Sequence, residues 1–397
     1  MRILVHDHSG HPFQAELSRE LARRGHTVTH SFATGYVSGK GRLSADGDAE
    51  ITFEGIGFTK RIDNMKFRRR LVHEVQRGFA LAWQARRTRA DITLVSNAQI
   101  PTLVVFTFLM AIFRKPWVLW HQDVYAIAVK SFAGAKLGRG YKLVAAVFAI
   151  AERWCSRRAE AIVVIAPSFV PVHEEWGTAD KVVVIPNWAP LDEIVPTDRD
   201  NAWAREHGLT EEKTLLYSGT LGLKHNPVLL VDLARRVREA GQPVRLVVVN
   251  EGPATGILLA EAEKQGVAID VLPFQPYERL PEVLGTGDVL LVLLEKEAGA
   301  FSVPSKTLSY LCAGRPILGM IPGENLAASL ITEAGGCVVP PEGGSLAEAA
   351  AWVETVLEDP EMWEKLGRSS RELAEREFAL ADCATRFEDI LVAASAR

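Results

Sequence analysis

Short apolar runs alternate with amphipathic stretches along the first half of the chain. Runs of the kind that form buried strands lie at 3–5, 26–28, 92–95, 117–120 and 162–165. Between the first two, Phe13, Leu17 and Leu21 recur at helical spacing, and Arg23-Arg24-Gly25 is a typical helix end. This alternation of strand and helix predicts a parallel sheet with helices on both faces.

The second half repeats the pattern. Strands are expected at 215–217, 244–249, 289–294 and 317–320, with a helix over 228–240. A connector with prolines at both ends, 185–190, separates the halves. We therefore expect α/β architecture with domains at 1–190 and 191–378, and a C-terminal helix in 379–397 that packs back on the first domain. Doubly wound sheets bind ligands at the carboxyl ends of their strands, so we expect these ends to face one cleft.

Length and cysteine usage agree with this organisation. A chain of 397 residues suits two domains of similar size, and 48% hydrophobic with 24% charged residues is typical of globular proteins. The four cysteines are widely separated and form no CxxC pair, which favours a reducing cytosol over a zinc site or disulfides. Polar residues from His6 onward come too early for a signal peptide.

Net charge differs between the halves. Residues 1–190 carry 26 Lys and Arg against 16 Asp and Glu, a net of +10, whereas residues 191–397 carry 19 against 33, a net of −14. Such a split indicates domains with different partners. A basic half can face phosphorylated ligands, an anionic membrane or nucleic acid. No nucleic-acid-binding motif accompanies it, so nucleic acid is not expected as a partner.

The positive charge is concentrated over 61–90, which holds nine Lys and Arg against two acids. Apolar residues recur there at every fourth position, namely Phe67, Leu71, Val75, Phe79 and Trp83. One interpretation is a basic amphipathic helix that lies on anionic lipid. The other is a helix packed on its own sheet with a solvated basic face. The apolar run 103–113 is too short to span a bilayer, so a peripheral association is expected.

Four segments of the second half carry a family resemblance. They are Y-S-G-T-L-G-L-K-H-N-P at 217–227, N-E-G-P at 250–253, L-P-F-Q-P-Y at 272–277 and V-P-S-K-T-L-S-Y-L-C-A-G-R-P at 303–316. Their order and spacing resemble the retaining glycosyltransferases of family four, especially the colanic-acid-biosynthesis type. The resemblance implies the GT-B fold, two doubly wound Rossmann-like domains facing a central cleft. It also implies transfer of a sugar, with retention, from a nucleotide-diphosphate-sugar to a lipid-linked glycan acceptor in cell-surface or exopolysaccharide synthesis.

The donor site is expected in the second domain. Gly219 and Gly222 follow a strand and allow the backbone to approach phosphate, while Lys224 would meet the charge of the leaving diphosphate. A plain glycine turn with a solvated lysine is the alternative. The resemblance implies further donor contacts from Gly10, Thr220, Glu251, Phe274, Ser302, Val303, Pro304, Ser305 and Ser309, with Ser305 also expected to cap a helix.

Two of these positions depart from the family pattern. Ser309 stands where the family has a glutamate that binds the donor ribose, and a serine hydroxyl is the weaker acceptor. Thr220 stands where many relatives have an arginine. A second family glutamate has only Glu297 nearby, out of register.

Catalytic candidates lie in the first domain. His121 follows a strand, and the resemblance places it at the catalytic centre beside the reacting sugar, although a lone histidine at a strand end is often structural. Asp123 is expected either to orient His121 or to cap a loop. His8 and His11 flank Gly10 where relatives have a glycine-rich loop, and both read equally well as surface histidines.

No metal ion or other cofactor is expected. Asp46-Gly47-Asp48 matches a metal-binding DxD motif only superficially, because it lies in a polar loop away from any strand. Fixed donors would stabilise the leaving diphosphate instead. The chain is expected in the cytoplasm, peripheral on the inner face of the cytoplasmic membrane. Two alternatives stay open: a nucleotide-sugar epimerase on the same fold, and a non-catalytic sugar-nucleotide-binding subunit.

Overall fold

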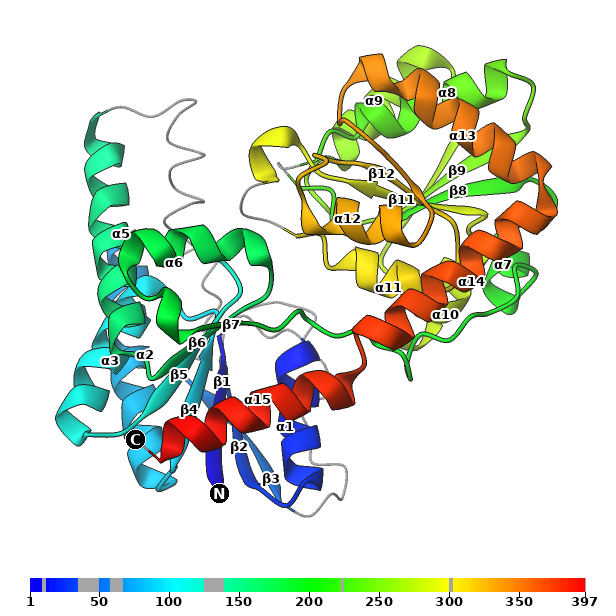
Figure 1. The fold of residues 1–397 in the computed structure, drawn as a ribbon. Helices are drawn as coiled ribbons and strands as arrows, with labels where there is room; N and C mark the ends of the chain where they lie inside the picture. The colour runs from blue at the N-terminus through cyan, green and yellow to red at the C-terminus, as the bar shows by residue number, and fades with distance from the viewer. Residues whose placement is uncertain are drawn as a thin grey trace. The chain divides into compact units, whose positions relative to one another are not determined.

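The computed structural model describes residues 1–8, 12–34, 50–57, 67–124, 139–222, 225–299 and 303–396. The chain divides into two compact units. Unit 1 comprises Met1–Asn187 with Leu380–Arg397, and unit 2 comprises Trp188–Ala379. Each unit is a twisted sheet with helices on both faces (Figure 1).

Unit 1 holds a sheet of seven parallel strands in the order β3-β2-β1-β4-β5-β6-β7. The strands are β1 (Arg2–Asp7), β2 (Thr27–Ala33), β3 (Ile51–Ile56), β4 (Ile92–Ser96), β5 (Trp117–His121), β6 (Ala161–Val164) and β7 (Val182–Val184). The helices are α1 (Pro12–Arg23), α2 (Phe67–Arg87), α3 (Ile100–Phe113), α5 (Arg139–Arg158), α6 (Val170–Trp176) and α15 (Leu380–Ser395). The strand order reverses direction between β1 and β4, which is the switch point of a doubly wound sheet.

The helices of unit 1 cover opposite faces of this sheet. On one face α2, α3 and α5 bury apolar residues against alternate strand positions, such as Leu119 and Ile162. On the other face α1 packs beside α15, and the rings of Trp120 and Phe387 lie 4.6 Å apart. Both faces of each central strand are therefore covered, which is why the middle positions of these strands are mostly apolar.

The last helix, α15, belongs to unit 1 although 192 residues of unit 2 precede it. Arg24 forms an ion pair with Glu388, and Nε2 of His26 lies 2.8 Å from the same carboxylate. The Cys383 thiol lies 3.8 Å from the carbonyl oxygen of Pro186. Trp188 to Pro190, expected at the end of the first domain, belong to unit 2, because the Ala189 amide donates to the carbonyl of Phe378.

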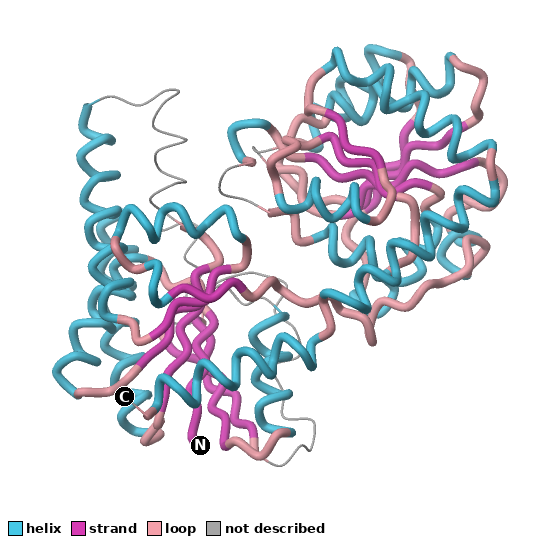
Figure 2. Tube along the Cα trace, viewed as in Figure 1, coloured by secondary structure: helices cyan, strands magenta, loops and turns pink. Residues whose placement is uncertain are grey.

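Unit 2 holds a sheet of six parallel strands in the order β10-β9-β8-β11-β12-β13. The strands are β8 (Lys213–Ser218), β9 (Val244–Val249), β10 (Ile269–Leu272), β11 (Val289–Leu293), β12 (Ile317–Met320) and β13 (Cys337–Val339). The helices are α7 (Ala202–Glu206), α8 (Val228–Glu239), α9 (Thr255–Gln265), α10 (Leu280–Thr286), α11 (Lys306–Cys312), α12 (Leu326–Glu333), α13 (Leu346–Glu358) and α14 (Pro360–Glu377). Figure 2 shows the strands gathered at the centre of this unit and the helices around them.

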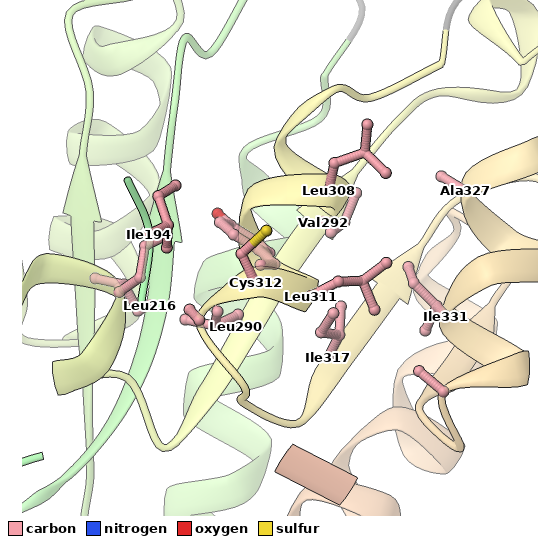
Figure 3. Close-up of a cluster of buried hydrophobic side chains, with 14 of the residues drawn as sticks. Ile194, Leu216, Leu290, Val292, Leu308, Leu311, Cys312, Ile317, Ala327 and Ile331 are labelled. Carbon is pink, nitrogen blue, oxygen red and sulfur yellow. The ribbon is translucent and has the colours of Figure 1, made fainter. Parts of the chain in front are cut away.

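Two apolar layers hold unit 2 together, one on each face of its sheet. Figure 3 shows part of the first layer, in which Leu308 and Leu311 of α11 and Ile331 of α12 lie over β11 and β12. The second layer places α8, α9 and α13 over the opposite face, with Leu233 and Val353 among its members. Each side chain of this size contributes about 1.5–3 kcal/mol when fully buried.

The strands and helices expected from the apolar pattern are confirmed within a few residues, and β9 and β12 coincide with the expected ranges. The strands β3, β7, β10 and β13 were not expected. Apart from β3 they have only three or four residues, and such short runs carry little periodicity. No helix in the described part of the chain combines the length and the apolar character needed to cross a membrane.

Candidate functional site

In unit 2 the turn after β8 lies at the switch point of the sheet, since β8 neighbours both β9 and β11. Gly219 opens this turn with φ of 139°, a conformation that L side chains rarely adopt. Thr220 is exposed, Leu221 is buried and Gly222 is half-buried. The turn is thus placed where doubly wound sheets bind ligands.

Several amides of this turn already have partners inside the protein. The Gly219 amide donates to the Val249 carbonyl at 2.9 Å, and the Leu221 amide donates to Asn250 Oδ1 at 2.7 Å. The Gly222 amide donates to Nδ1 of His225 at 2.9 Å. These three N–H groups hold the turn in shape, so an anion bound here needs other donors.

Lys306 supplies a positive charge at the turn. Its buried Nζ lies 3.4 Å from the centroid of the Tyr217 ring, within reach of a cation–π interaction. A Cβ built on Gly219 would lie 2.7 Å from the same Nζ, so a side chain at this position would displace the ammonium group. Lys306 lies in the 303–316 motif but was not among the expected donor contacts. The signal in the sequence was a lysine at the start of a helix that follows β11, the neighbour of β8.

Tyr310 fixes α11 to the end of β8. Its hydroxyl accepts from the Ser218 amide at 2.9 Å and donates to the Ser218 carbonyl at 3.1 Å. Burial raises the pKa of the Tyr310 phenol, which therefore stays neutral. These bonds hold Lys306, on the same helix, against Gly219.

The other expected donor contacts lie around α11 and β10. Ser309 is half-buried on α11, next to Tyr310. Ser305 occupies the N-cap position, but its side chain makes no capping hydrogen bond, contrary to expectation. Val303 is half-buried and Pro304 is buried. Glu251 and Phe274 come together, since the Phe274 amide donates to Glu251 Oε1 at 3.2 Å.

In unit 1, His121 ends β5 and is buried. Its Nε2 lies 3.0 Å from Glu152 Oε1 on α5, and its Nδ1 lies 3.2 Å from Nε2 of His173 on α6. Both ring nitrogens are thus engaged within the unit, and His121 would have to release one to touch a substrate. Asp123 is exposed, and Glu152 and His173, rather than Asp123, orient the His121 ring.

His8 is buried at the carboxyl end of β1, so its interpretation as a surface histidine is wrong. Its Nε2 lies 3.2 Å from Glu74 Oε2, and Arg77 forms an ion pair with the same carboxylate at 3.1 Å. Burial lowers the pKa of His8 and lowers that of the adjacent His6 well below its ordinary value. This buried cluster at the switch point of unit 1 joins β1 to α2.

Some expected site residues lie outside the described residues. They are Gly10, His11, Lys224, Ser302 and the Asp46-Gly47-Asp48 motif. The side chain of Glu297 is also not described. Within the residues that the structure describes, no group of three or more His, Cys, Asp or Glu is arranged to hold a metal ion.

Family models match both halves of the chain. The model described as "Glycosyl transferase 4-like domain" matches residues 11–188, and the model described as "Glycosyl transferases group 1" matches residues 199–373. The two matches meet near the boundary between the units.

Comparisons with individual proteins agree with the family models. The chain is 28% identical over 202 residues to the "Putative colanic acid biosynthesis glycosyl transferase WcaI" of Escherichia coli K12, a match that spans 50% of this chain and 49% of that protein. Sucrose-phosphate synthase from Thermosynechococcus elongatus is similar in structure, with a TM-score of 0.74, 15% identity and 98% of each chain covered. HepE of Anabaena, solved in complex with UDP-glucose, has a TM-score of 0.70 and 14% identity over 99% of this chain and all of that chain.

Proposed function

Since the chain belongs to the GT-B glycosyltransferases of family four, near the colanic-acid-biosynthesis group, we propose that it transfers a sugar from a nucleotide-diphosphate-sugar to a glycan acceptor. Unit 2 would bind the donor. Unit 1 would carry the acceptor and the catalytic centre near His121.

The observation that carries the proposal is the Lys306 ammonium group at the Gly219 turn. A diphosphate needs a positive charge close to a backbone with no bulky side chain, and this turn combines both. HepE, which shares the fold, was solved with UDP-glucose, which supports a nucleotide-sugar as the donor class. Lys224, two residues after Gly222, would add a second cation on the leaving diphosphate.

Ser309 and the pair Glu251 with Phe274 would complete the donor site. Ser309 lies next to Tyr310 on the helix that carries Lys306, and there it would contact the donor ribose. Phe274 is 43% exposed and can stack on a base or sugar, while Glu251 holds its backbone. Gly10, Thr220, Gly222, Ser302, Val303, Pro304 and Ser305 are proposed as further contacts.

We propose that the transferred sugar retains its configuration, and this proposal rests only on membership of the family. The transfer would need no metal ion, because two lysines can stabilise the charge that develops on the departing diphosphate. His121 would be held by Glu152 and His173 and would touch the sugar after releasing one of these bonds. Asp123, exposed two residues later, would contact the acceptor.

The proposed acceptor is a lipid-linked glycan of cell-surface or exopolysaccharide synthesis, by analogy with the relative named for colanic acid. Such an acceptor places the enzyme in the cytoplasm, peripheral on the inner face of the cytoplasmic membrane. The basic charge of residues 1–190, a net of +10, supports contact with anionic lipid.

A thermal-shift panel of nucleotide-sugars tests the donor assignment. Ligand that binds the folded state raises the melting temperature, by an amount set by the ratio of its concentration to its Kd. We expect one uridine, guanosine or adenosine diphosphate sugar to shift the transition, and the matching acceptor assay to show transfer. If no nucleotide-sugar shifts the transition, the non-catalytic alternative is favoured. Release of epimerised donor without any acceptor would favour the epimerase.

A further inference from the structure

Three neighbouring helices of unit 1, α2, α3 and α5, carry large apolar side chains that face away from the sheet. The exposed side chains, between 41% and 68% accessible, are Leu71, Val72, Phe79, Trp83, Phe108, Ile112, Val147 and Ile150. The opposite sides of the helices supply the core, with Leu81, Phe106 and Cys155 fully buried. The aromatic stripe expected on 61–90 is thus not the packing side of α2, since Phe79 and Trp83 are among the most exposed.

These side chains belong to one surface, because α3 packs between α2 and α5. Gly78 of α2 lies so close to α3 that a Cβ there would be 2.6 Å from Val105 Cβ. Thr102 Oγ1 donates to Glu74 Oε2 at 2.8 Å across the same contact. Figure 1 shows the three helices side by side on one face of the unit. We call the eight exposed residues and the helices that bear them the three-helix face.

The charge of this face has one sign. Along their sequences α2 carries six arginines and one acid, α5 carries five Lys and Arg and one acid, and α3 carries no charge. Both acids, Glu74 and Glu152, are buried, and so is Arg77, which forms an ion pair with Glu74. Exposed arginines flank the apolar side chains, among them Arg69, Arg70 and Arg86, and the Arg86 guanidinium lies 5.2 Å from the centroid of the Phe113 ring.

A basic cavity lies at the carboxyl end of α3. It has a volume of about 310 Å³, and its lining includes Ala111, Arg114, Lys115, Arg158 and Glu160. Ala111 is exposed and adjoins Ile112 of the three-helix face. Three cations against one carboxylate suit a phosphate head group whose acyl chains lie along Phe108 and Ile112.

We propose that the three-helix face docks on an anionic membrane surface, with its apolar side chains in the head-group region and its arginines on lipid phosphates. A second copy of the chain is a poor occupant, because two faces with the same positive charge repel each other. A lipid surface meets both properties, exposed apolar side chains and exposed arginines. Only the lipid-linked acceptor rests on the proposed function. The contact with lipid is inferred from the exposed apolar and basic residues of the three-helix face.

The test is co-sedimentation of the full chain with vesicles of phosphatidylcholine, alone or mixed with phosphatidylglycerol. Wild-type protein should pellet with the anionic vesicles, and less so at physiological salt, where the Debye length is about 8 Å. Arg69→Glu with Arg70→Glu should weaken this binding by at least about tenfold, since each cation near an anionic surface adds about a fivefold gain. Trp83→Gln with Phe108→Gln should weaken it to a similar extent by removing the apolar contacts.

A matched control comes from unit 2. Ile257 and Leu259 are 56% and 48% exposed on α9, so Ile257→Gln with Leu259→Gln removes two exposed apolar side chains elsewhere and should leave binding unchanged. All the substituted residues are exposed, and an unaltered melting temperature verifies folding. Thermal shift with nucleotide-sugars, read on the same variants, reports separately on the proposed donor site.

Three results would overturn the proposal. One is wild-type protein that ignores anionic vesicles at low salt. Another is equal binding by the wild type and both variants of the three-helix face. The third is a wild-type dimer in sedimentation velocity that Trp83→Gln with Phe108→Gln converts to a monomer, which would assign the face to a second copy of the chain.

Discussion

At the scale of the residue, the charge at the Gly219 turn comes from an unexpected position. Many relatives have an arginine at the position of Thr220, which here is exposed and uncharged. Lys306, 86 positions later, brings its Nζ to the same turn. We infer that Lys306 supplies the positive charge that Thr220 lacks.

Lys306→Met should weaken binding of the donor. A charge-assisted hydrogen bond to phosphate contributes about 1.5–3 kcal/mol, so Kd should rise by roughly 10- to 100-fold. Isothermal titration with the nucleotide-sugar found in the thermal-shift panel measures this. Lys264→Met, at a lysine whose side chain is 74% exposed on α9, is the control and should leave Kd unchanged. Equal affinities for the wild type and Lys306→Met would remove Lys306 from the site.

Buried histidines make the stability of unit 1 depend on pH. Burial lowers the pKa of His30 to about 3, with a further contribution from Arg19, and burial with the nearby His121 lowers that of His173 to about 3. The unfolded chain has histidine pKa values of about 6.5. Below pH 6.5 the unfolded state therefore binds protons that the folded state does not, and stability falls as the pH drops toward 3.

Urea unfolding at pH 7.5 and pH 5.0 should reveal this difference. Each of the two histidines should contribute about 2 kcal/mol to the loss at pH 5.0. His30→Asn should lose less stability between the two pH values than the wild type does, because one of the protons is no longer taken up. Identical free energies of unfolding for the wild type at both pH values would contradict the assignment.

At the scale of the element, α15 completes the sheet of unit 1. Its Phe387 is fully buried against Trp120, while its Glu388 contacts Arg24 and His26 at the edge. Without this helix, one face of β4 and β5 would be left uncovered. Burial of apolar side chains thus stabilises the packing of α15 on the sheet, and the contacts of Glu388 orient the helix.

Two substitutions in α15 separate these contributions. Phe387→Ala should lower the free energy of unfolding by about 3–5 kcal/mol, because it leaves a cavity in the core. Glu388→Gln should cost only about 0–1 kcal/mol, as partly exposed ion pairs usually do. Chemical denaturation of both variants measures the difference. Equal losses in the two variants would mean that the ion pairs, and not the apolar contact, hold the helix.

At the scale of the whole molecule, the two units have separate cores and charges of opposite sign. Each sheet has its own switch point, with Gly219 and Lys306 near that of unit 2 and His8 near that of unit 1. The net charge of +10 over residues 1–190 suits the proposed contact with an anionic membrane, whereas in the acidic second half the local charge of Lys306 would attract the proposed donor.

Hydrogen exchange with and without the nucleotide-sugar should locate the donor. We expect the largest gain in protection at 213–222 and 303–312, because bound ligand suppresses local opening of the segments it contacts. The three-helix face should gain least from the donor and most from anionic vesicles. If the donor protected segments of unit 1 more strongly than those of unit 2, the assignment of the donor site to unit 2 would be contradicted.

Much of the fold followed from the sequence, because long strands and helices repeat their apolar residues with a period that packing requires. The central strands β1, β4, β8 and β9 and the helix α8 were expected near their observed bounds for this reason. The strands β3, β7, β10 and β13 were missed. All four lie at the outer ends of the two sheets, where a strand depends on the hydrogen bonds that a neighbouring strand supplies.

The site was only partly predictable. Gly219 was predicted from its place after a strand. Lys306, in contrast, lies 87 positions from Gly219 in the sequence. Glu152 and His173 lie 31 and 52 positions from His121, which both of them contact. His8 was read as exposed because a single polar residue after a strand gives no sign that Glu74 will bury it.

The sequence by itself determined the class of fold, the division into two α/β halves, the separation of charge and the resemblance to family four. These properties depend on short segments or on sums over the chain, so they can be predicted without knowing which residues are in contact. Only the tertiary structure decided that the aromatic stripe of α2 faces outward beside α3 and α5, and that Lys306 meets Gly219. Helical periodicity shows which side chains share a face of a helix, but the neighbours that cover that face come from distant parts of the chain.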